Sequence, residues 1–405
     1  MMKMFEKTAL EMERCLRDGI LPFWMERMSD GRGGFHGRIS GDGHVDADAP
    51  RGAVLYSRIL WAFSAAYRAF GSPEYLEYAE HARKWLIDKF FDREYGGVLW
   101  SVSADGSPLE TKKQSYAIGF AIYGLSEHCR ATGDALSLDY AVRLYRSLEE
   151  HMRDSRLGGY FEAAARDWGP LTDVRLSGKD RNAPKTMNTH LHIIEPYTNL
   201  YRVWPDPELR SRLLDLTGIF LEKIVSPDTG HMGLFFDENW DEVSSGTVSY
   251  GHDIEASWLL AETARVLGDS SLTAKVDACC RMIARAALEG YMPDGSLAYE
   301  GFRDGSFDRE RHWWVQAECA VGLAWLCAVH GETSCLPMLE KTWDYIKTHL
   351  VDRTGGEWFW SIRADGSVNR TDDKAGFWKC PYHNSRMCLE IMRLFREDTV
   401  DTVLK

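Results

Sequence analysis

The sequence predicts an all-α protein, an (α/α)6 toroid of twelve helices with short hairpin loops, in which residues 1–405 form one domain. A glycine-rich turn followed by alternating aromatic and polar residues recurs six times, about 60 residues apart, and two helical segments separate successive copies. Self-similarity at a fixed period is the signature of a repeat architecture. The copies are GGFHGRISGDG from Gly33, GGVLWSVSADG from Gly96, GGYFEAAARDWG from Gly158, GHMGLFFDENWD from Gly230, PDGSLAYEGFRDG from Pro293 and GGEWFWSIRADG from Gly355.

The two helical segments of each repeat differ in character. Residues 51–71 are apolar on nearly all sides, whereas residues 72–91 carry apolar positions at i, i+3, i+4 and i+7. This difference predicts a buried inner ring of helices and an amphipathic outer ring. The Asp-Gly turns and short alternating stretches predict small hairpins between the helices. One excess stretch, residues 166–185, is polar, and such a long loop is usually a lid, a binding loop or disordered.

Composition and charge exclude several classes of protein. With 48 Lys and Arg against 61 Asp and Glu, the net charge of −13 disfavours nucleic acid and anionic membranes as partners. No apolar run approaches the roughly 18 residues of a membrane span, and the first residues lack a signal-peptide core. The nine cysteines show no C-x-x-C spacing, which predicts reduced core thiols. We therefore expect a cytoplasmic protein, a monomer or weak dimer, that binds a neutral small molecule.

Histidines cluster at the openings of three predicted inner helices. The openings MNTHLHIIEPYTNLY, SYGHDIEASWLLAE and KCPYHNSRMCLEIM hold four of the 13 histidines: His190, His192, His252 and His383. Inner helices of a toroid begin at one common face, so these side chains are expected around a central pocket. A single histidine at a helix opening is more often a cap or a satisfied polar residue. Three in equivalent positions around one cavity favour catalysis.

Helical spacing assigns neighbours to the histidines at the first opening. Asn188 and His192 are four residues apart and share a face, whereas His190 points about 200° away from His192. We expect Asn188 and His192 to face the pocket and His190 to have a packing role.

The other two histidines have charged neighbours at i, i+3. Glu255 follows His252 at this spacing, which predicts that its carboxylate holds one imidazole nitrogen protonated. Arg386 follows His383 at the same spacing, and a nearby cation favours neutral imidazole.

Aromatic and polar residues stand at or near the remaining openings. Flat rings suit the apolar C–H faces of a pyranose, and a carboxylate suits its hydroxyls. A cation on an apolar inner helix is costly to bury without an anionic partner or a transition-state charge. Because two of the tryptophans are adjacent, they cannot both face the same way. The residues are Arg58 in YSRILW, Tyr116 in KQSYAIGF, Trp313, Trp314 and Glu318 in RHWWVQAE, and Trp378 in GFWKCPYH.

Metal binding is the rival interpretation of the histidines. H-x-H and H-D-I-E both contain plausible ligands. On a helix, however, H-x-H splits its rings onto different faces, and the sequence has no H-x-x-x-H pair. The glycine-rich GRGGFHG lacks the lysine and the context of a phosphate loop, and no nicotinamide or flavin signature is present. We expect neither a metal nor a cofactor.

Four segments together resemble cellobiose 2-epimerases, a group within the N-acylglucosamine 2-epimerase superfamily. They are NTHLHIIEPYTNLYRVW (188–204), SYGHDIEASWLL (249–260), WWVQAE (313–318) and WKCPYHNSRMCLE (378–390), and the resemblance runs from about residue 20 to about residue 395. It implies an (α/α)6 barrel that epimerises C2 of the reducing-end glucose in β-1,4 disaccharides, typically cellobiose, lactose or mannobiose.

The resemblance also implies roles for residues at matching motif positions. His252 and His383 correspond to the acid/base pair, Glu255 to the partner of His252, and His192 and Arg58 to residues around ring opening and the C1/C2 oxygens. Positions at or beside the sugar are Tyr116, Asn188, Trp313, Trp314, Glu318 and Trp378. One departure is Tyr56, where the group has a small polar residue such as Asn; this side chain is expected to narrow or reshape the pocket.

The implied reaction needs two opposed histidines. One removes the C2 proton of the open-chain aldose to give a cis-enediolate, and the other returns a proton to the opposite face. Three alternatives remain open. A monosaccharide 2-epimerase or an aldose–ketose isomerase would use the same histidines. An inverting glycoside hydrolase would need two carboxylates about 6.5–9.5 Å apart, and a non-catalytic sugar-binding protein would not need three histidines.

Overall fold

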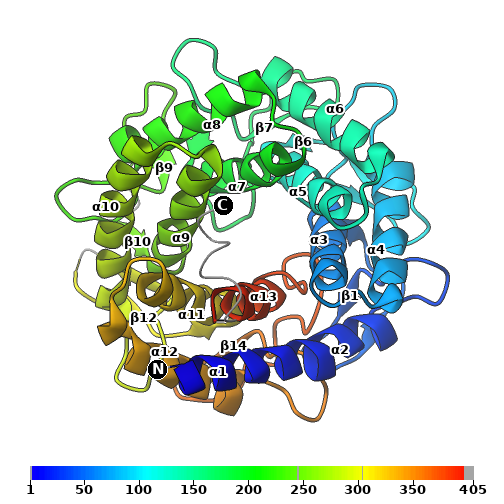
Figure 1. Ribbon diagram of the computed structural model, residues 1–405. Coiled ribbons are helices and arrows are strands. Elements are labelled where there is room, and N and C mark those ends of the chain that lie inside the picture. Colours follow the sequence, from blue (N-terminus) through cyan, green and yellow to red (C-terminus); the bar gives the residue numbers. More distant parts are fainter. Residues whose placement is uncertain (1, 244–245, 303, 396–405) are drawn as a thin grey trace.

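The computed structural model describes residues 2–243, 246–302 and 304–395, and their helices form two concentric rings (Figure 1). The inner ring comprises α3 (Ala53–Phe70), α5 (Ser115–Thr132), α7 (Met187–Val203), α9 (Tyr250–Leu267), α11 (Trp313–Ala328) and α13 (His383–Phe395). The outer ring comprises α1 (Met2–Arg14) and α2 (Leu21–Glu26), α4 (Pro73–Trp85), α6 (Ala135–His151), α8 (Pro207–Ile219), α10 (Ser270–Ala287) and α12 (Leu336–Tyr345). The predicted (α/α)6 toroid is confirmed, with α1 and α2 acting as one bent outer helix.

The inner helices are buried on all sides, as their composition predicts. In α3 every residue from Ala53 to Ala66 is buried, whereas α4 buries only Tyr75, Ala79 and Ala82 along one stripe. Three inner helices end at a glycine with positive φ, for example Gly71 after α3 (φ 68°). Glycine is favoured at these C-caps because it adopts the left-handed conformation without steric cost. Short π- or 3-10-helical turns extend the outer helices: η1 (Cys15–Ile20), η2 (Leu86–Phe90), η3 (Phe220–Ile224), η4 (Leu288–Gly290), η5 (Thr333–Cys335) and η6 (Ile346–Leu350).

Small antiparallel sheets carry the chain between the rings. Each of five inner helices is preceded by a short strand that pairs with a strand of the next hairpin, in the pairs β3–β4, β6–β7, β8–β9, β10–β11 and β13–β14. The pairing places every hairpin beside the start of the preceding inner helix, so all the hairpins gather at one face. The strands are β1 (Arg38–Ile39), β2 (Val45–Asp46), β3 (Arg51–Gly52), β4 (Ser101–Val102), β5 (Pro108–Glu110), β6 (Lys113–Gln114), β7 (Ala163–Ala164), β8 (Lys185–Thr186), β9 (Phe235–Phe236), β10 (Thr247–Ser249), β11 (Glu300–Phe302), β12 (Phe307–Asp308), β13 (Arg311–His312) and β14 (Ser361–Ile362).

The ring closes where the first and last helices meet. The chain enters on the outer ring and reaches its last inner helix in α13, which packs against α1 and η1 (Figure 1). Met12 and Leu16 are fully buried in this contact region. Among the described residues, no helix is both long and apolar enough to span a bilayer.

Candidate active site

A cavity of about 870 Å³ opens at the face where the inner helices begin. Its volume lies in the range of about 300–1,000 Å³ found for small-molecule sites. All but one of the predicted site residues line it: Arg58, Tyr116, Asn188, His192, His252, Glu255, Trp313, Trp314, Trp378 and His383. The exception is Glu318, which is fully buried behind the wall.

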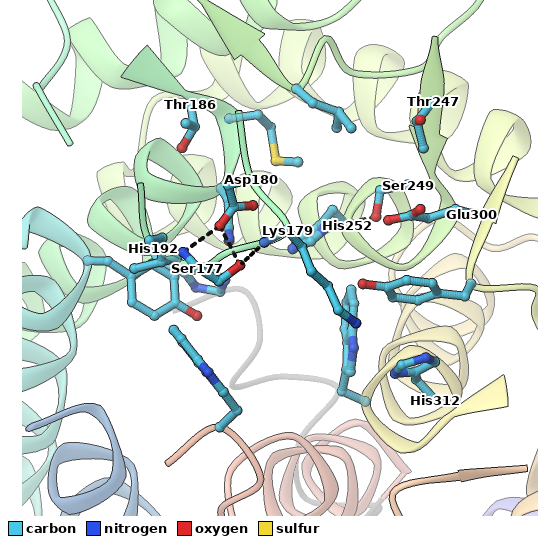
Figure 2. Close-up of a pocket in the computed structure, with 18 of the residues that line it drawn as sticks. Ser177, Lys179, Asp180, Thr186, His192, Thr247, Ser249, His252, Glu300 and His312 are labelled. Carbon is cyan, nitrogen blue, oxygen red and sulfur yellow. Dashed lines mark hydrogen bonds between the residues drawn. The ribbon is translucent and has the colours of Figure 1, made fainter. Parts of the chain in front are cut away.

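The excess segment 166–185 contributes residues 175–181 to the cavity wall. Figure 2 shows Ser177, Lys179 and Asp180 beside the same cavity as His192 and His252. The amide and the hydroxyl of Ser177 both donate to Asp180 Oδ2 at 2.8 Å. The side chain of Gln114, at the start of α5, donates to the carbonyls of Val174 and Arg175 and attaches the loop to the barrel.

A bend in α7 positions His192. Pro196 has no N–H, so the carbonyl of His192 lacks its helical partner, and His192 departs from helical geometry (φ −91°, ψ 16°). Helix α5 approaches this carbonyl at Gly119, where an added Cβ would lie 2.4 Å from the His192 oxygen. Only glycine permits that approach. The bend therefore results from the sequence of two helices.

Each pocket histidine has its Nδ1 atom held by a different partner. His192 Nδ1 lies 3.1 Å from Glu195 Oε2, and His383 Nδ1 lies 2.7 Å from Glu318 Oε1. His252 Nδ1 lies 2.7 Å from the hydroxyl of Ser249. In each case Nε2 is the nitrogen left to exchange a proton with a ligand.

The expected pairing of His252 with Glu255 is wrong. The spacing i, i+3 permits this contact, but His252 lies at the start of α9 and its ring turns back to Ser249, which precedes the helix. The Glu255 carboxylate instead accepts a hydrogen bond from Arg386 of α13. The missed partners Ser249 and Glu195 had a signal in the sequence, because both lie three residues from their histidines.

A buried guanidinium organises the carboxylates behind the cavity. Arg386 donates to Glu195, Glu255 and Glu318, which come from three different inner helices. All four side chains are almost completely buried. The placement of Glu318 as a sugar ligand is therefore wrong, since its oxygens are taken by Arg386, His383 and the indole N–H of Trp258.

The two histidines at the starts of α9 and α13 both contact one aromatic ring. The Trp314 ring centroid is 4.7 Å from that of His252 and 5.6 Å from that of His383. Trp313, the adjacent residue, packs at 4.6 Å against Trp360. Trp314 is thus the tryptophan in close contact with both candidate bases.

Arg58 is a buried cation without a carboxylate partner among the described residues. Its guanidinium donates to the Tyr116 hydroxyl at 2.8 Å and to the Trp378 carbonyl at 3.4 Å, and it lies 4.1 Å from the Phe120 ring centroid. Its Nε atom has no hydrogen-bond partner. Because no carboxylate neutralises this guanidinium, it is available to stabilise negative charge that develops on a ligand.

Burial keeps the pocket histidines neutral. Loss of hydration lowers the pKa of His252 to about 3, with the neighbouring His192 adding to the effect. Burial also lowers the pKa of His192 and of His383 below the ordinary value near 6.5. Burial opposes ionisation of Glu195 as well, but Arg386 outweighs it and lowers the pKa of Glu195 to about 2. Neutral imidazole is the form that accepts a proton.

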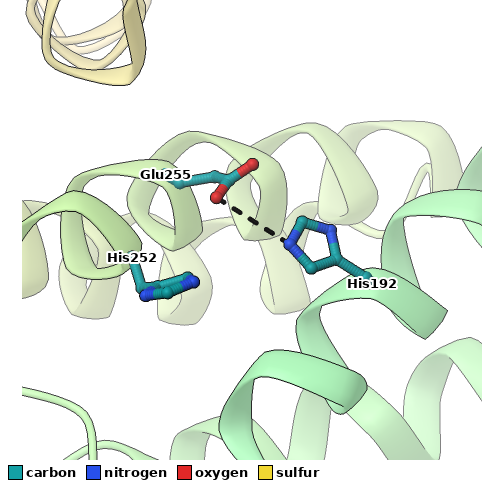
Figure 3. Close-up of side chains that lie close together, drawn as sticks. All are labelled: His192, His252 and Glu255. Atoms are coloured by element: carbon teal, nitrogen blue, oxygen red, sulfur yellow. Dashed lines mark ion pairs between the residues drawn. The ribbon is translucent and has the colours of Figure 1, made fainter. Parts of the chain in front are cut away.

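Two groups of side chains have the composition of a metal site. His192, His252 and Glu255 point toward one another, with His192 Nε2 4.0 Å from Glu255 Oε2 (Figure 3). Two imidazoles and a carboxylate are ligands that zinc accepts. The second group, Glu255, Glu318 and His383, already surrounds Arg386 Nη2, so a cationic group occupies its centre.

Two further predicted features lie away from the cavity or at its edge. His190 packs as expected, with Nδ1 2.6 Å from the Thr186 carbonyl and Nε2 accepting from the Tyr160 amide. Tyr56 does not reshape the pocket: it points about 200° away from Arg58 on α3 and binds the backbone of Phe35.

Asn188 lines the cavity, and its Oδ1 atom has no hydrogen-bond partner.

The fold and this cavity place the chain among helical barrels that include sugar-converting enzymes. A solved D-mannose isomerase matches with a TM-score of 0.81 at 19% identity, over 95% of this chain and 97% of the other, which shows a shared fold. Residues 33–386 match the model of the N-acylglucosamine 2-epimerase family. The chain belongs to this family.

Closer relatives carry a more specific name. A cellobiose 2-epimerase of Bacteroides fragilis is 56% identical over 384 residues, which cover 94% of this chain and 98% of the relative. The solved cellobiose 2-epimerase of Bacillus thermoamylovorans has a TM-score of 0.91 at 40% identity, covering 96% of this chain and 99% of that one.

Proposed function

We propose that the protein epimerises C2 of the reducing-end sugar of β-1,4-linked disaccharides: cellobiose to glucosyl-mannose, lactose to epilactose, and mannobiose. The observation that carries the proposal is that His252 and His383 line one cavity and both contact the Trp314 ring. The names of the similar proteins from Bacteroides fragilis and Bacillus thermoamylovorans support the substrate class.

The reaction follows from the arrangement of the side chains. The sugar ring opens, assisted by His192 and Arg58, and the aldehyde acidifies the C2 proton. One of His252 and His383, neutral at working pH, removes this proton through Nε2 and leaves a cis-enediolate. The carbon then turns about the C2–C3 bond, and the other histidine returns a proton to the opposite face. Each acid–base step contributes about 10²–10⁴-fold.

Arg58 supplies the electrostatic stabilisation. Its guanidinium lacks a carboxylate partner and is therefore available to the enediolate oxygens. The N-termini of the converging inner helices add partial positive charge at the same face. The proposed chemistry needs neither a metal nor a cofactor, so dialysis against EDTA is expected to leave turnover unchanged.

A glycoside hydrolase is the less favoured candidate. Glu255 and Glu318 both bind Arg386, and Glu318 also holds His383 and Trp258, so neither is free to act as the acid or base of a hydrolase. A monosaccharide 2-epimerase or an aldose–ketose isomerase would use the same histidines. The cavity of about 870 Å³ favours the disaccharide.

A neutral sugar is also the partner that the charge favours, since a net charge of −13 repels polyanions. The unpaired cysteines support a reducing, cytoplasmic location.

Cellobiose incubated with the protein in D₂O and followed by NMR tests the proposal. We expect deuterium at C2 and a new reducing-end mannose signal. Free glucose as the product would support the hydrolase instead, and a ketose as the main product would support the isomerase. Unchanged cellobiose alongside turnover of free glucose or mannose would support the monosaccharide enzyme.

A further inference from the structure

In four hairpins, one residue occupies an equivalent place at the start of an inner helix. Its carbonyl accepts the hydrogen bond of the first helical N–H, at 2.9–3.0 Å in four repeats: Trp100 from Ala53, Glu162 from Ser115, Leu234 from Met187 and Trp360 from Trp313. Three of these four residues, Glu162, Leu234 and Trp360, line the cavity. Glu162 is the acid at a position that otherwise carries a large apolar side chain.

The Glu162 carboxyl is buried with one oxygen free. Its side chain is nine-tenths or more buried, since the residue is only 2% exposed. Oε2 accepts from the Thr189 hydroxyl at 2.7 Å, whereas Oε1 has no hydrogen-bond partner. The backbone is fixed on both sides, because the Glu162 amide donates to Pro184 and its carbonyl accepts from Ser115. No lysine or arginine of the described residues forms an ion pair with it.

The surroundings favour the protonated acid. Burial raises the pKa of Glu162 to about 8, against the neighbouring Thr189 and Thr186, which lower it. Asp180 of segment 166–185 is the charged group that faces it, and this like charge raises the pKa further. The neighbouring Thr186, at the N-cap of α7, and Thr189, in its first turn, are uncharged. At neutral pH the carboxyl is therefore a hydrogen-bond donor.

A second unpaired group lies on the same wall. Asn188, in the first turn of α7, also lines the cavity with its Oδ1 atom unpaired, and it adjoins the Thr189 that binds Glu162. Leaving buried polar groups without partners costs free energy, and a sugar hydroxyl both donates and accepts.

We propose that Glu162 adds a hydroxyl-binding subsite beside Asn188, a residue that the family resemblance already places at the sugar, and that the Glu162 carboxyl donates a hydrogen bond to a sugar hydroxyl. This subsite rests on the proposed function and adds a specificity-determining residue that does not take part in proton transfer at C2. It binds neutral sugar hydroxyls rather than a charged substituent.

Two substitutions at one position test the subsite. Glu162→Gln keeps the shape and a neutral donor, whereas Glu162→Leu installs the residue found at the equivalent position 234. We expect Glu162→Leu to lower kcat/KM for cellobiose by about tenfold or more, mainly through KM, and Glu162→Gln to stay within about threefold of the wild type. Thermal unfolding of both variants checks that the fold is intact.

The pH profile separates a ligand contact from a merely structural role. Above a pH of about 8 the wild-type carboxyl ionises and loses its proton, so kcat/KM is expected to fall there. The pocket histidines titrate at lower pH and do not produce this alkaline limb. The Glu162→Gln variant is expected to lack it.

Monodeoxy cellobioses identify the hydroxyl. The analogue that lacks the partner hydroxyl is expected to bind wild type and Glu162→Leu equally, whereas the others discriminate between them. Calorimetric titration measures this binding independently of turnover, so a result against the subsite can be distinguished from a result against the epimerase activity. Wild-type affinity and an unchanged alkaline limb in Glu162→Leu would refute the subsite, whether or not the protein epimerises cellobiose.

Discussion

At the scale of single residues, the three pocket histidines are chemically unequal. His192 and His383 each have a carboxylate at Nδ1, whereas His252 has the Ser249 hydroxyl. A carboxylate stabilises the imidazolium that forms after proton uptake, and a hydroxyl does so less well. In the proposed reaction Glu318 therefore stabilises the protonated form of His383, whereas His252 has only the Ser249 hydroxyl for this purpose.

Replacing either candidate base tests this assignment. We expect His252→Asn and His383→Asn each to lower kcat by at least about 10²–10⁴-fold, because one face of C2 loses its acid–base group. Asparagine keeps polarity and leaves the unfolding midpoint close to that of the wild type. His44→Asn, an exposed histidine outside the cavity, serves as the matched control and is expected to retain full activity. Turnover near the wild-type level in either pocket variant would contradict the mechanism.

Glu318 is expected to act through His383 as a positioning residue. Glu318→Gln keeps a hydrogen-bonding group beside the histidine but removes the charge that stabilises imidazolium, so kcat is expected to fall by about tenfold with little change in KM. Both substitutions remove one carboxylate from the buried Arg386, but Glu318→Ala also removes the hydrogen-bond acceptor, and breaking the buried ion pair in this way costs about 3–5 kcal/mol of stability. Steady-state kinetics and urea unfolding measure the two effects. Equal behaviour of the Gln and Ala variants would argue against a positioning role.

At the scale of elements, two helices combine to shape the site. Pro196 frees the His192 carbonyl in α7, and Gly119 lets α5 approach it. Because the bend orients His192, close packing between α5 and α7 is part of the functional geometry as well as of the core.

Adding one methyl group at this contact is expected to disturb both packing and activity. In Gly119→Ala the new Cβ would meet the His192 carbonyl at 2.4 Å, and overpacking of this kind costs about 1–3 kcal/mol. The displaced His192 is expected to lower kcat/KM as well. The control is Gly218→Ala on α8, where nothing lies within 4 Å and the higher helix propensity of alanine stabilises by about 0.5–1 kcal/mol. Urea unfolding should shift in opposite directions for the two variants, and kinetics should show a loss of activity in Gly119→Ala alone.

At the scale of the whole molecule, the barrel depends on closure between its two ends in sequence. Helix α1 and turn η1 pack against α13, the helix that carries His383. Each inner helix borders its neighbours, so an opening at this seam would displace one of the two candidate bases.

Truncation of a buried side chain where α1 and η1 meet α13 measures how much this contact contributes to the free energy of unfolding. Leu16→Ala removes a fully buried side chain and is expected to cost about 2–5 kcal/mol of unfolding free energy. Leu10→Ala, at a position 49% exposed on α1, is expected to change stability by no more than about 0.5 kcal/mol. Chemical denaturation gives both values, and a loss as large at position 10 as at position 16 would contradict the role of the seam.

The sequence by itself determined the repeat, the two kinds of helix and the face at which the inner helices begin. These follow from periodicity, since an all-apolar helix must be buried and hairpins of equal length bring equivalent positions together. The histidines at positions 192, 252 and 383 could therefore be placed around one pocket before any coordinates were known.

The tertiary structure decided which atoms pair. Glu255 follows His252 at a spacing that allows contact, yet it binds Arg386 from another helix, and Glu318 proved to hold His383 rather than face the cavity. Such partners lie more than 60 residues apart in sequence, and helical spacing describes only neighbours on the same helix. Charge pairing among buried groups is a property of the assembled barrel, because each carboxylate takes the cation and the donors that packing brings to it.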